Sequence, residues 1–132
     1  MTTIFSKIIA REIPAQFVYE DEVCVAIMDK FPAITGQVLV IPKKAVDYAF
    51  DLDDETYTHI FLVAKKITKA LDIVFATNRT CLIVEGFEVP HVHIKLYPMT
   101  SQDKNLASAI DNAKEKSDPE LQTEADKIKA AL

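Results

Sequence analysis

The stretch that decides the fold and the chemistry of this chain is residues 90–98, which read PHVHIKLYP. Successive side chains of a β-strand point to opposite sides of the sheet. On such a strand one side carries the polar groups His91, His93, Lys95 and Tyr97. The other side carries the apolar groups Val92, Ile94 and Leu96. The stretch therefore predicts a strand with one side in the core and a row of imidazole and ammonium groups on the other.

The polar row suits a ligand that carries phosphate. Neighbours on one side of a strand lie about 6.5–7 Å apart, so a phosphate-sized group can lie along the row. A neutral imidazole at His93 can attack phosphorus, and the charge of Lys95 should lower the pKa of that ring. The strand alone leaves two other interpretations open. One is a metal site with Glu85 or Glu88, which the Lys95 ammonium disfavours, and the other is a pair of structural histidines.

The segments on both sides of this stretch predict an α+β domain. Apolar spacing predicts a short helix at residues 3–9, and an acidic cluster at 51–55 begins one long helix that reaches Val74. Asp118 and Pro119 predict the N-cap and the first residue of a final helix. Runs of β-prone residues predict five strands, at 17–19, 23–28, 38–41, 80–84 and 89–97. We expect an antiparallel sheet of about five strands with helices on one side, comprising one long helix and short terminal helices.

Composition narrows the class of protein. The length of 132 residues and 49% hydrophobic content predict a single domain, residues 1–132, with its own core. The net charge of -5 argues against general binding to nucleic acid polymers or acidic membranes. Neither a membrane-spanning run nor a signal peptide is evident, and Cys24 and Cys81 fit reduced thiols. We therefore expect a cytoplasmic protein.

Several segments, in order, make the chain similar to the histidine triad (HIT) family. Residues 91–94, HVHI, resemble the start of a motif in which three histidines alternate with hydrophobic residues. Residues 4–14, 19–29, 36–44 and 51–55 resemble the family's opening segment, its hairpin, the next strand and the start of its long helix. The resemblance covers residues 3–98 and leaves about 101–132 as a C-terminal helical extension. The most similar branch is the small nucleotide hydrolases and phosphoramidases.

The resemblance implies a site and a reaction. It makes His93 the nucleophile that takes a nucleotidyl group, His91 a residue that helps to orient it, and Asp29 the acid that holds the ribose hydroxyls. The residues around the base would be Phe5, Ile8 and Ile27. The expected protein is a homodimer that needs no cofactor. It would act on a purine nucleoside phosphate or conjugate through a covalent nucleotidyl-histidine.

The motif departs from the family pattern at the phosphate. Lys95 stands in place of the third histidine, and Ala45 where the family often has another. Val84 stands where an asparagine is usual, and the short loop at 85–89 has no glutamine or serine. These losses motivate a second hypothesis, a nucleotide-binding module with weak or absent catalysis. Against it, the charge of Lys95 can replace part of the lost stabilisation of the phosphate.

Two further positions concern metal binding. Thr3 and Ser6 occupy the places of two cysteines that bind zinc in some bacterial relatives, so we expect no metal there. His59 lies alone in the predicted long helix, where a histidine is usually a surface or packing residue, and we expect no functional role for it.

Overall fold

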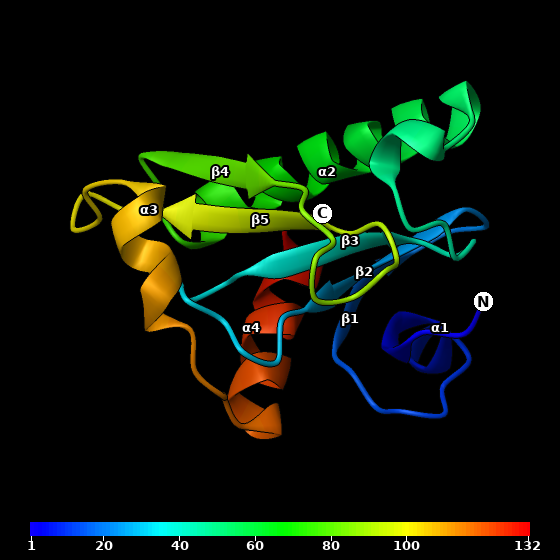
Figure 1. The fold of residues 1–132 in the computed structure, drawn as a ribbon. Helices are drawn as coiled ribbons and strands as arrows, with labels where there is room; N and C mark the ends of the chain where they lie inside the picture. Colours follow the sequence, from blue (N-terminus) through cyan, green and yellow to red (C-terminus); the bar gives the residue numbers. More distant parts are fainter.

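The computed structural model describes residues 1–132 and contains one sheet of five antiparallel strands (Figure 1). The order across the sheet is β1-β2-β3-β5-β4, so the strand that begins directly after His93 lies inside the sheet, between β3 and β4. The predicted α+β class is confirmed. The strands are β1 (Phe17–Glu20), β2 (Cys24–Met28), β3 (Val38–Pro42), β4 (Arg79–Ile83) and β5 (Ile94–Met99).

Four α-helices and two short 3₁₀ turns accompany the sheet. They are α1 (Ile4–Ile9), η1 (Ala49–Asp51), α2 (Asp54–Val74), α3 (Leu106–Ala109), η2 (Ile110–Asn112) and α4 (Asp118–Ala130). The long helix α2 begins after Asp53, whose side chain accepts a hydrogen bond from the Thr56 N–H, as a capping carboxylate does. In α4 the N-cap is Ser117 rather than the predicted Asp118, because its hydroxyl accepts from the Glu120 N–H. No helix combines the length and the apolar character that crossing a membrane requires.

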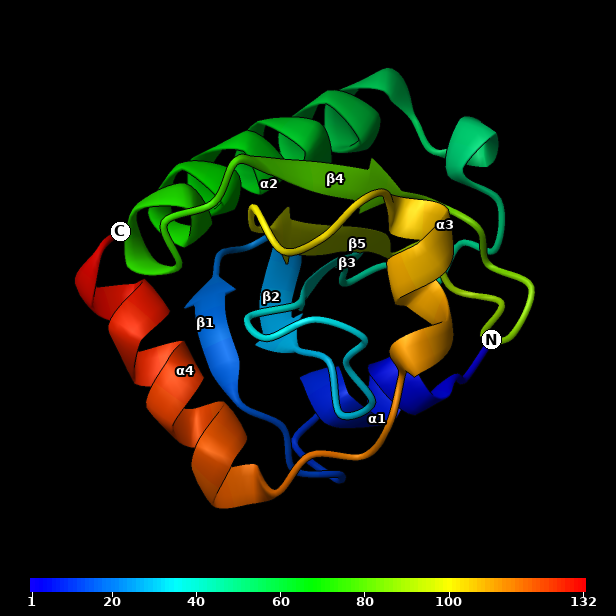
Figure 2. The ribbon, with the colours of Figure 1, turned by 90° about the vertical axis from the view of Figure 1, so that its left-hand side faces the viewer.

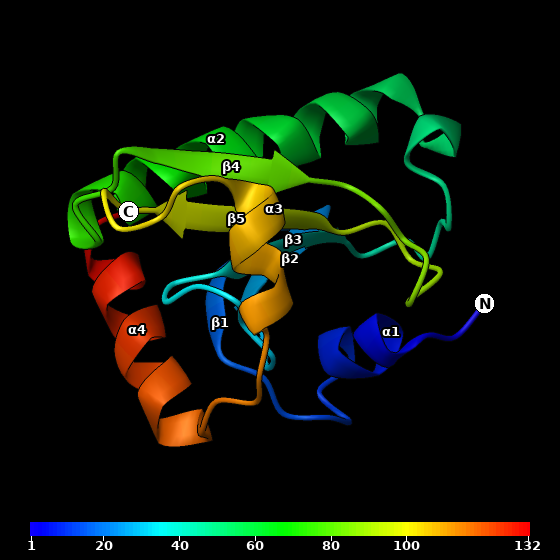
Figure 3. The ribbon, with the colours of Figure 1, turned by 60° about the vertical axis from the view of Figure 1, so that its left-hand side comes forward.

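Helices cover both faces of the sheet, so the prediction that they lie on one side was wrong (Figures 2 and 3). α2 and α4 pack on the face that buries Val92, Ile94 and Leu96. α1 packs on the opposite face through Phe5 and Ile8. The reason is that β2 and β3 are buried along their whole length, as expected of strands covered on both sides.

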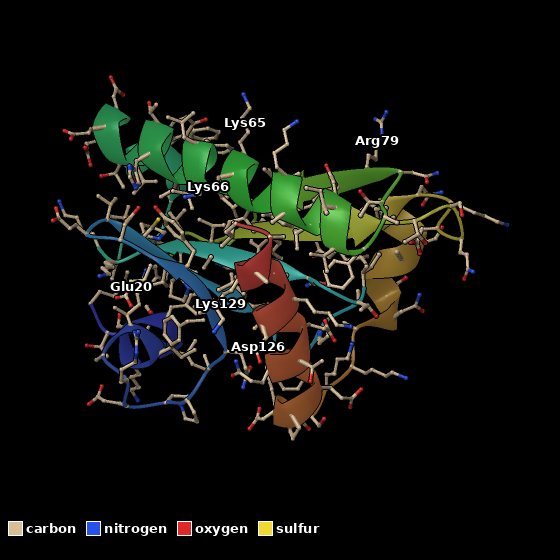
Figure 4. All side chains as sticks on the ribbon, turned by 180° about the vertical axis from the view of Figure 1, so that it is seen from behind. Glu20, Lys65, Lys66, Arg79, Asp126 and Lys129 are labelled. Atoms are coloured by element: carbon tan, nitrogen blue, oxygen red, sulfur yellow. The ribbon has the colours of Figure 1, made fainter.

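The outer surfaces of α2 and α4 carry charged side chains. Figure 4 shows Lys65 and Lys66 on α2, and Asp126 and Lys129 on α4. All four are exposed. The Lys66 ammonium lies over the ring of Tyr19 in β1, 5.1 Å from its centroid. The apolar sides of these helices fill the larger core. The opposite face of the sheet is covered only in part by α1 and carries the cavity described below.

The turn before β3 depends on Gly36. This residue has φ +85°, a region that costs about 1–2 kcal/mol for residues with a Cβ. A Cβ on Gly36 would also overlap the ring of Phe75, which follows α2. Gly86 has a similar φ of +91°, but the nearest atom to its Cβ position is the Asp47 carbonyl oxygen, 3.6 Å away.

Replacing Gly36 with alanine is therefore expected to lower the free energy of unfolding by about 2–4 kcal/mol, as strain and overpacking add. The matched change Gly86→Ala should cost only the strain, about 1–2 kcal/mol. Urea denaturation of both variants measures the difference. Equal losses would show that the Phe75 contact contributes nothing.

Candidate functional site

A cavity of about 730 Å³ opens on the face of the sheet that carries α1. α1 lies on one side of it, and η2 and the start of α4 supply residues on another. Six of the seven residues predicted for the site line this cavity: Phe5, Ile8, Ile27, Asp29, His93 and Lys95. The structure therefore brings together side chains from four places. Phe5 and Ile8 come from α1, Ile27 from β2, Asp29 from just after β2, and His93 and Lys95 from the point where β5 begins.

His93 presents one uncommitted nitrogen to the cavity. Its Nδ1 lies 2.7 Å from the carbonyl oxygen of His91. Because a carbonyl only accepts, Nδ1 carries the hydrogen, and the neutral ring then has its lone pair on Nε2. Nε2 has no partner among the protein atoms, and no buried side-chain nitrogen is left unpaired, so Nε2 is accessible from the cavity. The Phe5 ring packs edge-on against the imidazole with 4.9 Å between centroids, which restrains its orientation.

The pKa of His93 lies below its ordinary value of 6.5, chiefly because burial penalises the charged ring. The hydrogen bond to the His91 carbonyl opposes this lowering of the pKa. The charge of Lys95 adds to the lowering, but its effect is smaller than either of the other two. The sequence predicted the direction but named Lys95 as its cause. Burial could not be foreseen because it depends on α1, which packs Phe5 over the ring.

An NMR titration tests this order of causes. We expect the His93 imidazole to titrate below pH 6.5 in the wild type and still below 6.5 in Lys95→Met, since burial remains. Because the unfolded chain then binds more protons below pH 6.5 than the folded protein does, stability should fall as the pH decreases through that region. A return to 6.5 in Lys95→Met would show that the charge, rather than burial, sets the pKa.

His91 acts through its backbone and does not line the cavity. Its ring is fully buried, with Nε2 donating to the Pro42 carbonyl at 2.8 Å and Nδ1 accepting from the Thr3 hydroxyl at 2.7 Å. His91 lies on the α1 side of the sheet, as the alternation predicts, with its ring centroid 5.7 Å from that of Phe5, but its ring is buried and does not reach the cavity. The reason is that Thr3 and Phe5, at the start of α1, cover the ring. Fixing the His91 ring fixes the carbonyl that orients His93.

The first turn of the chain supports this arrangement. The Thr3 and Ser6 hydroxyls lie 3.2 Å apart, and each side chain caps the other's backbone N–H at the start of α1. These are the two positions at which we expected no zinc site. Here the Thr3 hydroxyl hydrogen-bonds the His91 ring, and Ser6 holds Thr3 in place.

Beyond His93, the cavity side of β5 presents Lys95 and Tyr97. Lys95 forms no ion pair within the protein, so its ammonium is free to contact an anion. Burial, together with nearby carboxylates including Asp29, raises the pKa of Tyr97 to about 12, so its hydroxyl stays protonated. The sequence pattern placed Tyr97 on the polar side of the strand but gave it no role. Its position two residues after Lys95 was the signal that it faces the cavity.

Asp29 is held in place as it leaves β2. One carboxylate oxygen accepts from the Phe31 N–H at 2.9 Å, and the other from Gln37 Nε2 at 2.7 Å. A carboxylate offers about four acceptor positions, so two remain for a ligand. Gln37 was not predicted, because only the folded turn brings it back to Asp29. Beside this carboxylate, Phe5, Ile8 and Ile27 belong to one apolar cluster that can cover a flat ring.

A second group of potential ligand atoms lies on the other face of the sheet. Asp21, Cys24 and His59 place one such atom each within 4.8 Å of the others. The Asp21 carboxylate already accepts from His59 Nε2 at 2.6 Å, from the Tyr19 hydroxyl and from two backbone N–H groups. Burial raises the pKa of the Cys24 thiol to about 12, which keeps it protonated. The group fits a hydrogen-bonded network that links β1, β2 and α2, and His59 belongs to this network.

The cavity thus combines a free imidazole nitrogen, a cation, a carboxylate with open positions and an apolar slot. Comparisons with known proteins place the chain in a family. A model of the HIT domain matches residues 10–101. An uncharacterized HIT-like protein of Synechocystis sp. is 39% identical over 101 residues, which cover 71% of this chain and 87% of that protein.

Solved structures share the whole fold. A HIT-like protein from Bartonella henselae is 30% identical with a TM-score of 0.87, and the match covers 99% of this chain and 97% of that one. A hypothetical histidine triad nucleotide-binding protein from Sulfolobus tokodaii is 27% identical with a TM-score of 0.85, covering 97% and 90%. The family model matches most of the chain, a relative is 39% identical, and the fold is shared. This chain therefore belongs to the HIT domain family, the histidine triad proteins.

Proposed function

We propose that this protein binds a purine nucleoside phosphate or a conjugate of one and transfers its nucleotidyl group to His93. The observation that carries the proposal is the geometry of His93, whose Nδ1 is held by the His91 carbonyl while Nε2 faces the cavity. The Sulfolobus tokodaii relative is described as nucleotide-binding, which supports the same class of ligand. Asp29 would accept the ribose hydroxyls, and the apolar slot would cover the base.

The proposed reaction has two displacements at phosphorus. In the first, the Nε2 lone pair forms a P–N bond as the bond to the leaving group breaks, and the leaving group takes a proton from the Lys95 ammonium. In the second, water or another acceptor attacks phosphorus, its proton returns to Lys95, and the P–N bond breaks to release neutral His93. The Lys95 charge would stabilise the negative charge on the phosphoryl oxygens in the first step until its proton is transferred, and the proton that returns in the second step restores this charge.

A second function is favoured by the loop before the motif. Glu85 and Glu88 line the cavity, and both are carboxylates that repel a phosphate. The loop also lacks the neutral donors that the family resemblance leads one to expect. A nucleotide-binding module with weak or absent turnover would fit these features, with Lys95 holding the phosphate.

Turnover of adenosine 5′-phosphoramidate, with a dinucleoside polyphosphate alongside, separates the two functions. The enzyme is expected to release AMP, whereas the module would bind AMP by calorimetry without consuming either substrate. We propose that neither function needs a metal or other cofactor, so the rate should be the same in EDTA. A loss of turnover in EDTA would contradict that part of the proposal.

We further propose that the protein is a homodimer, as the resemblance to the family implies. β4 is an edge strand with one side unpaired, and it leaves Leu82 44% exposed. An exposed edge strand is a surface on which another copy can pair. Light scattering should give the mass of two chains for the wild type and of one for Leu82→Glu. A monomeric wild type would contradict the proposal.

A further inference from the structure

The turn between β2 and β3, which we call the Asp29 loop (residues 29–37), is closed around Gln37. The Gln37 side chain is 3% exposed, and its amide donates to Asp29 while its oxygen accepts from the Ala33 N–H at 2.8 Å. The Asp29 N–H also donates to the Gln37 carbonyl at 3.1 Å. The direction of the Asp29 carboxylate therefore depends on where the chain places Gln37.

The residue before Gln37 is held by the C-terminal helix. The Gly36 N–H donates to Glu124 Oε1 at 2.8 Å, and Glu124 Oε2 lies 2.5 Å from Lys116 Nζ. Glu124 is only 8% exposed. Burying a charge is costly unless it is paired, and here the paired carboxylate accepts from a backbone N–H of the loop. Phe75 closes the other side of Gly36, so the loop has little room to shift.

The segment that leads into α4 runs along the same loop. The Lys116 N–H donates to the Lys30 carbonyl at 3.1 Å, and Lys30 Nζ donates to the Lys116 carbonyl and to the Asp118 carboxylate, both at 2.8 Å. Asp118 and Ala113 also line the cavity. In Figure 2 this segment, in orange, connects α3 to α4 below the loop. The extension beyond the family-matched residues is therefore built into the wall of the site.

We propose that the C-terminal extension positions Asp29 for the ribose, with Glu124 as a positioning residue that acts through Gly36 and Gln37. The inference rests on the proposed function, since it concerns the ribose of the nucleotide. A carboxylate that accepts from both ribose hydroxyls binds a ribonucleotide better than a 2′-deoxyribonucleotide. Selectivity between the two sugars thus reports the position of Asp29 directly, whereas a general loss of stability would leave the ratio of affinities unchanged.

The test compares the dissociation constants of AMP and 2′-deoxy-AMP, measured by calorimetry on the full-length protein. In the wild type we expect AMP to bind about tenfold or more tightly, the effect of one hydrogen bond to a charged acceptor. Glu124→Ala should bring the ratio to within about twofold of one. It should raise KM for adenosine 5′-phosphoramidate and leave kcat within about threefold, because His93 lies on other elements.

The matched control is Asp126→Ala, which removes an exposed carboxylate from the same helix. Asp126 pairs only with Gln122 and Lys129 and is directed away from the sheet (Figure 4). The ratio of the two dissociation constants in Asp126→Ala should equal that of the wild type. If Glu124 acts through Asp29, then Glu124→Ala should have no further effect on the ratio in an Asp29→Ala background, since coupled residues are not additive.

Each outcome decides the inference. The inference is overturned if folded Glu124→Ala prefers AMP over 2′-deoxy-AMP as strongly as the wild type does. It is also overturned if the wild type itself binds the two nucleotides about equally. If that variant does not fold, Glu124→Gln, which keeps an acceptor for Gly36 but loses the Lys116 pair, should still lower the ratio by about threefold, and an unchanged ratio overturns the inference. A wild type that binds neither nucleotide refutes the proposed function itself, whereas AMP binding with unaltered selectivity in Glu124→Ala refutes only the role of Glu124.

Discussion

Replacing His93 with alanine is expected to lower kcat for adenosine 5′-phosphoramidate by about 10⁴-fold or more, the scale of losing a nucleophile. The change removes the only nitrogen in the cavity that combines a free lone pair with a fixed orientation. AMP should still bind, because the Asp29 carboxylate and the apolar slot are unchanged. Turnover assays and calorimetry on the same preparation measure both quantities.

His59→Ala is the matched control for this change. It removes an imidazole of the same chemistry that lies on α2 and contacts Asp21, on the opposite face of the sheet. Its kcat should stay within about threefold of the wild type. If His93→Ala turned over substrate at the wild-type rate, the assignment of the nucleophile would be wrong.

Replacing Lys95 with alanine is expected to lower kcat by about 10²–10³-fold, the usual effect of removing one preorganised donor to a developing charge. Lys95 has no ion-pair partner of its own, so its ammonium is available to the phosphoryl oxygens. KM should change less than kcat if the contact strengthens in the transition state.

Two further substitutions at this position separate charge from proton transfer. Lys95→His rebuilds the family motif and should restore most of the rate near neutral pH. Lys95→Arg keeps the charge but holds its proton much more tightly, so it should bind phosphate and yet release the leaving group slowly. An unchanged kcat in Lys95→Ala would show that the phosphate does not reach this residue.

The sheet was predictable from the sequence because its signals are local. Val92, Ile94 and Leu96 alternate with polar residues, and they pack against α2 and α4 as that alternation requires. The acidic cluster before α2 also predicted where the long helix begins, since a capping carboxylate is a local feature. The place of α1 on the opposite face was missed, although the uninterrupted apolar runs of β2 and β3 were a signal that both faces are covered.

The site was only partly predictable because its details depend on long-range contacts. Asp29 was named from the family resemblance. Gln37, which donates to it, belongs to a turn, and Glu124, which accepts from the neighbouring Gly36 N–H, belongs to a helix far along the chain. The alternation rule correctly placed Lys95 and Tyr97 toward the cavity. It also placed His91 on the side of α1, but it could not show that Thr3, Phe5 and Pro42 bury the ring away from the cavity.

The central claim is a covalent bond between phosphorus and His93, and mass spectrometry of the reacting enzyme tests it most directly. The wild type would be mixed with adenosine 5′-phosphoramidate, quenched in alkaline denaturant and digested with trypsin. The peptide of residues 80–95 contains both motif histidines, and fragmentation across Val92 separates them. We predict an adenylyl group on His93 that is absent from His93→Ala. Turnover with an adduct on His91, or with no adduct at all, would contradict the account.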